Sequence, residues 1–257
     1  MGISKNLSSD VDIATVSRDD VEANIEFAGF INFKNVLKAE TRQVLKELDE
    51  GDVRSVMITG DNVLTGINIA QECKLIPTGW RVLLGSNVDS DGEIVWIDSA
   101  TDEVAKPPTL DTLDGPASHV VLAVTGEVWS KLLKTPGYAI QLSEHIRVYG
   151  RCTPNDKVSI VSTFVKEGYI TLMCGDGGND CGALKTAHVG IALSRAEASV
   201  VSPFTSLDLS LTAVTDVLKE GRCALASAFS SYKYMIMYGQ VCSFFLVMTI
   251  NLSGNLY

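Results

Sequence analysis

The chain has no cluster of basic residues, no Cys-x-x-Cys pair and little histidine. Its 257 residues include 21 Lys and Arg against 31 Asp and Glu, which gives a formal net charge of −10. Nucleic acids are bound through clustered Lys and Arg, so this balance argues against a nucleic-acid partner. The six cysteines follow no signal peptide, so we expect reduced thiols in a cytosolic environment.

Charge is also missing from the end of the chain, where no charged residue follows Lys233. Residues 235–252 are mainly Met, Ile, Val, Phe and Leu, and about twenty apolar residues are enough to cross a bilayer as a helix. Three basic residues precede this segment and none follows it, so the positive-inside rule predicts a transmembrane helix with the preceding part in the cytoplasm. A buried hairpin or core helix is the alternative, which the polar residues Gln240, Ser243 and Asn251 keep open.

In the rest of the chain, helical and strand patterns alternate, and this predicts an α/β fold with a parallel sheet flanked by helices. Residues 85–118 are rich in Asp, Ser, Thr, Gly and Pro and predict a polar inserted loop. The helix from Pro154 has Thr153 as its predicted N-cap. The strand patterns cover residues 27–33, 53–59, 82–84, 120–124, 146–149, 169–173 and 189–193, and the helical ones residues 38–49, 63–73, 127–133 and 153–167.

A glycine-rich acidic turn follows the strand pattern 169–173. Its sequence is Gly175-Asp176-Gly177-Gly178-Asn179-Asp180. Magnesium takes oxygen ligands, usually one or two carboxylates with a substrate phosphate, and open α/β sheets bind ligands beyond the carboxyl ends of their strands. The turn therefore predicts a Mg²⁺ and phosphate site. The alternative is an acidic turn without a ligand, because Gly, Asn and Asp are ordinary turn residues.

Two more polar groups follow strand patterns at the same predicted edge. Thr59, Gly60 and Asp61 offer a hydroxyl, backbone amides and a carboxylate beside a helix N-terminus, which suits a phosphate. Arg151 and Lys157 flank a strand-to-helix turn and can supply positive charge to a phosphoryl group. Each group alone is compatible with a turn or a solvated helix, but the three together are more specific.

These strings resemble the phosphorylation-domain motifs of the P-type ATPases, which are members of the haloacid dehalogenase superfamily. The resemblance covers the chain from about Phe27 to its end and implies a haloacid dehalogenase-like, Rossmannoid parallel sheet with a C-terminal transmembrane helix. The run at residues 174–185, followed by residues 196–204, is similar to the type V branch and, within it, to the polyamine-transporting subgroup. The three motif strings are Ile58-Thr59-Gly60-Asp61-Asn62, Arg151-Cys152-Thr153-Pro154-Asn155-Asp156-Lys157 and Gly175-Asp176-Gly177-Gly178-Asn179-Asp180.

The resemblance implies a role for each motif residue. Thr59 would contact the phosphoryl group with Asp61 supporting the site, and Lys157 would neutralise the phosphoryl oxygens. Asp176 would hold Mg²⁺ with Asp180 supporting it. The implied catalytic set is Thr59, Asp61, Lys157 and Asp180, and the implied nucleotide- or phosphate-binding set is Thr59, Gly60, Asp61, Arg151, Lys157 and Asn179.

The same resemblance implies a domain organisation and a function. Residues 1–33 would be a remnant of a nucleotide-binding domain and hinge, residues 34–221 the phosphorylation domain, and residues 222–257 a stalk and transmembrane helix. ATP would phosphorylate an aspartate, and hydrolysis would drive a cation, in this subgroup a polyamine, across a membrane. The implied partners are ATP, the cation, the lipid bilayer and the remaining pump domains, with the catalytic domain cytoplasmic. The resemblance favours an endolysosomal membrane.

One family motif is absent. The nucleophilic aspartate of the family lies in an Asp-Lys-Thr-Gly-Thr string at the end of the sheet's first strand, and these 257 residues contain no such string. We therefore predict that this chain alone is inactive as an ATPase. Two alternatives are a membrane-tethered phosphatase of the same superfamily that uses Asp89 as nucleophile, and a non-catalytic Mg²⁺- or nucleotide-binding fragment. Asp89 lies in the string Asp89-Ser90-Asp91-Gly92, which is more typical of a turn.

Overall fold

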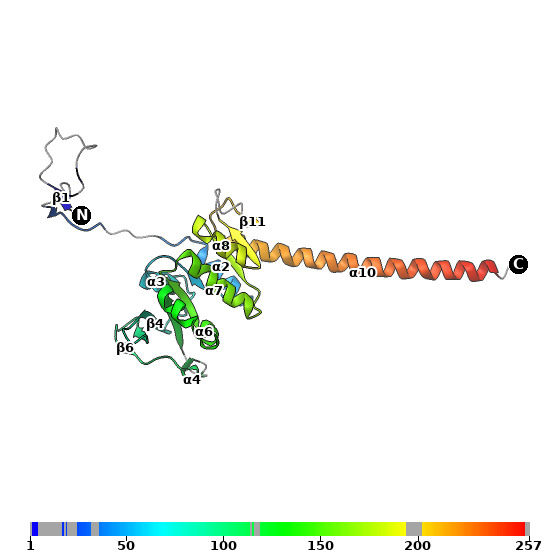
Figure 1. Ribbon diagram of the computed structural model, residues 1–257. Helices are drawn as coiled ribbons and strands as arrows, with labels where there is room; N and C mark the ends of the chain where they lie inside the picture. The colour runs from blue at the N-terminus through cyan, green and yellow to red at the C-terminus, as the bar shows by residue number, and fades with distance from the viewer. Residues whose placement is uncertain are drawn as a thin grey trace, which may run out of the picture. The chain divides into compact units, whose positions relative to one another are not determined.

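A computed structural model of the chain, shown in Figure 1, describes residues 2–4, 17, 19, 25–31, 36–113, 115, 119–193 and 202–254. The chain divides into two compact units, Met1–Leu37 and Lys38–Tyr257. In the first unit, β1 (Gly2–Ser4) pairs antiparallel with β2 (Ile25–Phe27). The predicted strand over residues 27–33 is wrong beyond Phe27, because residues 28–31 form no strand and residues 32–35 lie outside the described residues.

The second unit contains two sheets that are mainly parallel, as predicted. In the larger sheet the strand order is β3-β8-β7-β4-β5-β6, and the smaller sheet has the order β11-β10-β9. Pairing is parallel throughout the smaller sheet and from β3 to β4, whereas β5 and β6 are antiparallel additions. The strands are β3 (Met57–Ile58), β4 (Arg81–Val88), β5 (Ile94–Asp98), β6 (Val104–Ala105), β7 (Val120–Thr125), β8 (Ile146–Gly150), β9 (Leu172–Gly175), β10 (Val189–Ala192) and β11 (Phe204–Thr205).

Helices cover both faces of the larger sheet, and the central strand β7 is apolar on both faces. Leu122 and Val124 join one core cluster, whereas Val121 and Ala123 join another, as the two-residue repeat of a strand requires. The first cluster includes residues of α5, α6 and α7, and the second includes residues of α3. The helices are α2 (Thr41–Glu50), α3 (Val63–Glu72), α4 (Leu110–Leu113), α5 (Gly126–Leu132), α6 (Pro136–Ser143), α7 (Pro154–Lys166), α8 (Cys181–Thr186) and α10 (Thr212–Gly254), with a 3₁₀ turn η1 (Gly178–Asp180).

Three helices that follow strands are capped by side chains, and Thr125 caps α5 by accepting the N–H of Val128 at 3.3 Å. Thr153 is the N-cap of α7, as predicted, and accepts the N–H of Asp156 at 3.2 Å, while the Asp156 carboxylate accepts the N–H of Thr153 at 2.8 Å. Asn62 caps α3 by accepting the N–H of Leu64 at 2.9 Å. These caps fix where each strand-to-helix turn ends.

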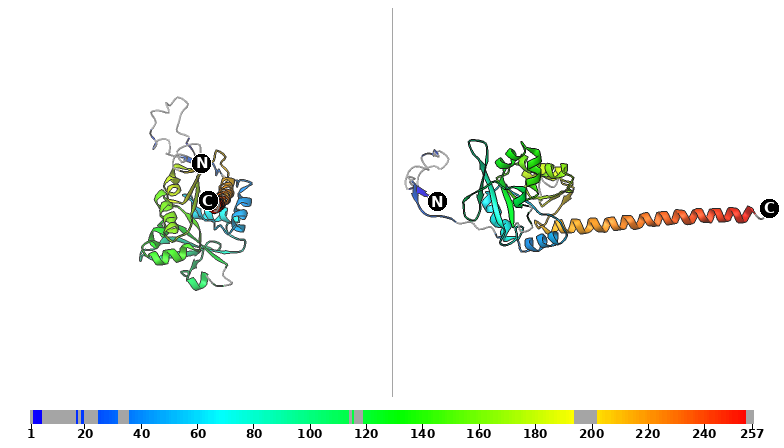
Figure 2. Two further views of the ribbon diagram at one scale, coloured as in Figure 1. Left: turned by 90° about the vertical axis from the view of Figure 1, so that its right-hand side faces the viewer. Right: turned by 90° about the horizontal axis from the view of Figure 1, so that it is seen from below.

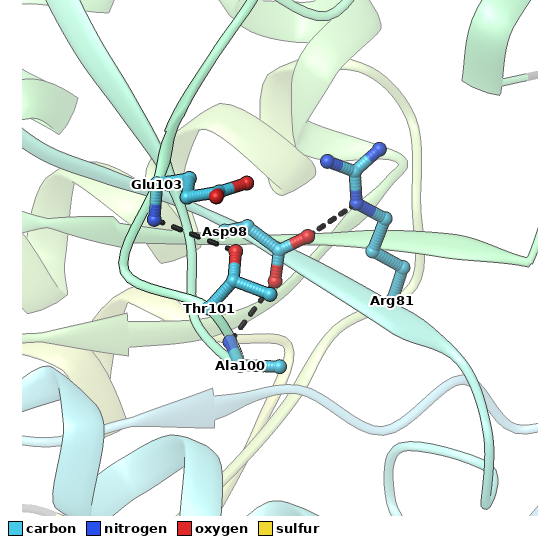
Figure 3. Close-up of polar contacts among 5 residues, drawn as sticks. All are labelled: Arg81, Asp98, Ala100, Thr101 and Glu103. Atoms are coloured by element: carbon cyan, nitrogen blue, oxygen red, sulfur yellow. Dashed lines mark hydrogen bonds and ion pairs between the residues drawn. The ribbon is translucent and has the colours of Figure 1, made fainter.

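The composition predicted a loop over residues 85–118, but the described part of this segment contains strands. β4 continues to Val88 and is followed by β5 and β6. Trp96 of β5 is 2% exposed and belongs to the main core cluster, so this segment is part of the folded core. Figure 3 shows the contacts at the end of the hairpin opposite the β4–β5 turn: Asp98 pairs with Arg81 of β4 and accepts the N–H of Ala100 at 2.9 Å.

Strand β3 is shorter than the predicted strand over residues 53–59. The guanidinium of Arg54 donates to the carbonyl oxygens of Ser143 and Ile146, at 2.8 and 2.9 Å. This side chain therefore connects the segment before β3 to the start of β8, where the sequence pattern predicted a backbone ladder. Burial lowers the pKa of the Arg54 guanidinium.

Helix α10 is a single unbroken helix from Thr212 to Gly254, which confirms the predicted continuity through residues 222–238 (Figure 2). Its first turns pack on the domain: Val214 shares a core cluster with Val44 of α2 and Ile191 of β10. The ammonium of Lys219 also lies 3.6 Å from the carboxylate of Glu47 of α2. The helix is long and apolar enough to cross a membrane.

Candidate functional site

A cavity of about 360 Å³ lies at the carboxyl ends of β3 and β9. Four predicted site residues contribute to its wall: Thr59, Lys157, Asp176 and Asp180. They come from three separate segments of the chain, which the fold brings to one cavity. The other lining residues are Lys38, Ile58, Met173, Cys174, Gly175, Leu193, Leu209 and Leu211.

Lys157 and Asp180 form the most enclosed charged pair of this site. The ammonium of Lys157 donates to the Asp180 carboxylate at 2.7 Å, and the two side chains are 12% and 10% exposed. Gly175 makes this position of Asp180 possible, because a Cβ at residue 175 would lie 2.7 Å from the carboxylate oxygen. The carboxylate is thus packed against the end of β9 and holds the ammonium at the cavity.

Asp176 and Asn179 follow β9 with different placements. Asp176 is exposed and lines the cavity, so its carboxylate is accessible to a solvated ion. Asn179 lies in η1 and is also exposed, but it does not line the cavity. The structure therefore brings Asp176 to the site and leaves the side chain of Asn179 outside it.

The turns after β3 and β8 are joined by backbone hydrogen bonds. The Arg151 N–H donates to the Asp61 carbonyl at 2.8 Å, and the Cys152 N–H donates to the Thr59 carbonyl at 3.0 Å. The hydroxyl of Thr59 accepts the N–H of Asp61 at 3.1 Å. Gly60, Asp61 and Arg151 are exposed and do not line the cavity, so they border the site next to Thr59.

Arg151 has a left-handed backbone, with a φ of 52°. This conformation is uncommon for a residue other than glycine and produces the sharp turn between β8 and α7. Gly150 precedes it, and a Cβ at that position would lie 2.4 Å from the Cα of Val63. The turn therefore depends on a close approach between β8 and the start of α3, which keeps Thr59 near α7.

Lys38 is a cavity residue that the motifs did not predict. It lies just before α2, and its positive charge opposes the rise in the pKa of Cys174. Burial, with the charges of Asp176 and Asp180, raises that pKa to about 11. No spacing rule connects Lys38 with the later motifs, so only the fold reveals it. With Lys157 it gives the cavity two cations beside two carboxylates.

The carboxylates at this cavity fit Mg²⁺ better than zinc. Asp176 and Asp180 have carboxylate oxygens that could serve as ligands, and Mg²⁺ is usually bound by one or two carboxylates together with water and phosphate. A structural zinc site needs about four nitrogen or sulfur ligands. Within the described ranges, no group of three or more His, Cys, Asp and Glu side chains gathers where it could hold a metal.

Asp89, the alternative nucleophile, closes the turn between β4 and β5. Its carboxylate accepts the N–H groups of Asp91 and Glu93, at 3.0 and 2.9 Å. Asp89 is not a cavity residue. These contacts agree with the interpretation of this string as a turn and separate Asp89 from Lys157 and Asp176.

The chain is similar in sequence to curated ATPases. The vacuolar cation-transporting ATPase YPK9 of Saccharomyces cerevisiae is 40% identical over 244 residues, which cover 88% of this chain and 16% of the relative. The polyamine-transporting ATPase 13A3 of Homo sapiens is 35% identical over 262 residues, which cover 95% of this chain and 21% of the relative. The probable cation-transporting ATPase 13A5 of Mus musculus is 39% identical over 240 residues, which cover 89% of this chain and 20% of the relative.

No protein-family model matches the chain. The similarity to the relatives nevertheless extends over about nine-tenths of the chain. The chain spans only about one fifth of the length of these relatives. It is a homologue of the type V P-type ATPases, and it corresponds to that one fifth of their length.

Proposed function

We propose that this chain supplies the Mg²⁺- and phosphate-binding part of the aspartyl-phosphate site of an ATP-driven pump. The observation that carries this proposal is the convergence of Thr59, Lys157, Asp176 and Asp180 on one cavity at the carboxyl ends of β3 and β9. Relatives named as cation- and polyamine-transporting ATPases support a cation as cargo, with polyamines as the narrower class.

Each residue then has a physical task in phosphoryl transfer. Lys157 would bind phosphoryl oxygens through its ammonium, which Asp180 holds in place. The Thr59 hydroxyl accepts the N–H of Asp61 and can donate its own hydrogen to a phosphoryl oxygen. Asp176 and Asp180 would hold Mg²⁺, which when bound would neutralise developing charge on the phosphoryl group.

The bordering residues have secondary tasks in this proposal. Asp61 and Gly60 would hold the turn that presents Thr59, since the Asp61 N–H donates to the Thr59 hydroxyl and the Asp61 carbonyl accepts the N–H of Arg151. Arg151 and Asn179 are exposed and would contact the nucleotide from outside the cavity. Helix α10 would anchor the site to the membrane, with the domain on the cytoplasmic side because Lys233 and earlier basic residues precede the apolar part.

Metal binding by the full chain tests this proposal directly. Mn²⁺ serves as a paramagnetic substitute for Mg²⁺, with inorganic phosphate present and the protein in detergent micelles. We expect Mn²⁺ to broaden the NMR signals of Asp176 and Thr59 and the ³¹P signal of phosphate. Asp176→Asn removes one ligand charge with little change in volume and should reduce this broadening at least about fivefold.

Asp91→Asn is the matched control, because Asp91 lies in the turn between β4 and β5, away from the cavity. It should leave the broadening unchanged. Equal broadening of Thr59 in the wild type and in Asp176→Asn would show that this turn is not the metal site.

A further inference from the structure

The charged side chains of the cavity differ in how far their charge is already compensated. Lys157 and Asp180 lie 2.7 Å apart and are nearly enclosed, so each offsets the charge of the other. Lys38 and Asp176 are exposed and line the same cavity. Among the described residues, the ammonium of Lys38 forms no ion pair and no hydrogen bond. Of the described cavity residues, Lys38 therefore has the cationic charge that is left for an anionic ligand.

The backbone that carries Lys38 is anchored at the rim of the cavity. The Lys38 carbonyl accepts the N–H of Thr41 at 3.1 Å, in the turn that begins α2. Glu40 of the same turn accepts a hydrogen bond from Ser210, which lowers the pKa of this carboxyl after the larger effect of the Glu40 backbone N–H. Ser210 itself accepts the N–H and the hydroxyl hydrogen of Thr212, at 3.2 and 2.9 Å. The position of the Lys38 backbone is thus fixed by neighbouring contacts, while its ammonium is available.

The charge of Lys38 acts inside the cavity and not only at its rim. Burial, followed by the two cavity carboxylates, raises the pKa of the Cys174 thiol to about 11, and the positive charge of Lys38 opposes this rise. Leu193 and Leu211 form part of the same wall, and charges interact more strongly beside apolar groups than in bulk water. A phosphate that enters the cavity would therefore be attracted by Lys38 as well as by Lys157.

We propose that Lys38 binds phosphoryl oxygens directly and is a second phosphate-binding cation of the site, beside Lys157. This inference rests on the proposed function and adds to it a residue from outside the three motifs. A phosphate group carries up to about two negative charges, and the charge of Lys157 is already offset by Asp180. An ammonium is a compact charge with three donors, so two of them from different elements can bind different oxygens of one phosphate.

Binding of inorganic phosphate to the full chain in detergent micelles, with Mg²⁺ present, tests this inference. A ³¹P NMR titration gives the dissociation constant. Lys38→Gln removes the charge but keeps most of the side-chain length, and it should raise the dissociation constant about tenfold. Lys38→Arg keeps the charge and should stay within about threefold of the wild type. Lys46→Gln is the matched control, because Lys46 lies on α2 in an exposed pair with Glu50 and does not line the cavity.

Acetylation of lysine side chains in the wild type gives a second measurement that does not depend on the folding of the variants. Inorganic phosphate should slow the acetylation of Lys38 at least about threefold relative to chloride at the same ionic strength, because a bound phosphate covers the amine. The rate at Lys46 should be the same in both salts. Mass spectrometry of the labelled peptides gives both rates.

The failure of this inference can be told apart from that of the proposed function. Equal phosphate affinity of the wild type and Lys38→Gln, or equal acetylation of Lys38 in phosphate and chloride, overturns the inference, while Mn²⁺ broadening that depends on Asp176 would still support the metal site. A wild type that binds no phosphate overturns both. If Lys38→Gln weakens the binding of a non-hydrolysable ATP analogue but not that of inorganic phosphate, Lys38 contacts the nucleotide, and the inference is wrong.

Discussion

At the scale of single residues, Lys157 and Asp180 are the cavity residues whose substitution should change the stability of the domain most. Both side chains are nearly enclosed and lie 2.7 Å apart. Removing one partner of such a pair leaves a charge with little water to solvate it, which costs more than the pair itself contributes. The pair is therefore both a positioning contact for the ammonium and a weak point of the domain.

We expect Asp180→Ala to lower the free energy of unfolding by about 3 kcal/mol, because it strands the Lys157 ammonium. The double variant Asp180→Leu with Lys157→Met should recover at least half of this loss. Chemical denaturation of the full chain in detergent measures both. Lys46→Ala is the control, since Lys46 and Glu50 form an exposed pair at 3.5 Å that contributes about 0.5 kcal/mol or less. A loss in Asp180→Ala no larger than in this control would contradict the expectation.

Cys174 offers a chemical probe of the same cavity. Its pKa is raised to about 11, first by burial and then by Asp176 and Asp180, all of which disfavour the thiolate. Only the thiolate reacts with iodoacetamide, so at pH 8 its alkylation should be about 100-fold slower than that of Cys223, which is exposed on α10. The rate at Cys174 should rise as the pH approaches 11. Mass spectrometry of labelled peptides gives both rates, and similar rates at pH 8 would refute the prediction.

At the scale of elements, the hairpin of β4 and β5 depends on Asp98, whose pKa is lowered by the bond from the Ala100 N–H and by Arg81. Asp98→Ala should cost about 1–3 kcal/mol of stability, because it leaves these donors without their acceptor. Since the folded pKa is depressed, the contribution of Asp98 is present above its unfolded value near 3.8 and is lost as the pH falls below that value.

Thermal unfolding at pH 7 and at pH 3 tests this, with the difference between wild type and Asp98→Ala expected to shrink at pH 3. Glu103→Ala is the control, because only the backbone of Glu103 takes part in the contact with Thr101 shown in Figure 3. A difference that stays constant between the two pH values would argue against the ionised carboxylate as its cause.

The sequence predicted the elements that rest on local chemistry. Thr153 and Pro154 marked the start of α7, and apolar runs marked β7, β8 and β10 within one or two residues. The prediction from the sequence was wrong where tertiary contacts determine the structure. Arg54 replaces part of the ladder of β3, and Trp96 brings β5 into the core from a segment whose composition is that of a loop.

The candidate site follows the same division. Thr59, Lys157, Asp176 and Asp180 lie at strand ends, so the rule that parallel strands share a carboxyl edge was enough to expect them together. Lys38 was missed because its place at the cavity depends on how the segment before α2 packs. The motif resemblance could not predict that the side chains of Arg151 and Asn179 are exposed. The run at residues 196–204 lies mostly outside the described residues, since the structure describes only residues 202–204 of it.

At the scale of the whole molecule, α10 decides how the protein behaves in solution. The apolar window of this helix is 0% buried, and Phe244, Phe245 and Leu246 are more than half exposed. The hydroxyls of Ser243 and Thr249 each donate a hydrogen bond of 2.8 Å to a backbone carbonyl of the same helix, which satisfies these polar groups without water. These features favour a lipid environment for the second half of α10.

Truncation before Lys233 should therefore yield a domain that is soluble and monomeric without detergent, while the full chain requires detergent. Size-exclusion chromatography with light scattering measures both. The truncated chain keeps the first turns of α10 that pack on α2 and β10, so its unfolding transition should match that of the full chain in detergent. A full chain that stays monodisperse and monomeric in plain buffer would rule out the membrane assignment.

Because α10 is continuous, a small tilt at its base produces a larger displacement at its far end. A helix of 43 residues is about 65 Å long, and its base is fixed to α2 and β10 through Val214 and Lys219. Because nothing in the described helix interrupts it, a tilt of about 5° at the base displaces the far end by about 6 Å, roughly one helical turn. β10 pairs with β9, which ends next to Asp176, so a small shift beside the cavity that tilts the base of α10 is enlarged at the far end of this helix.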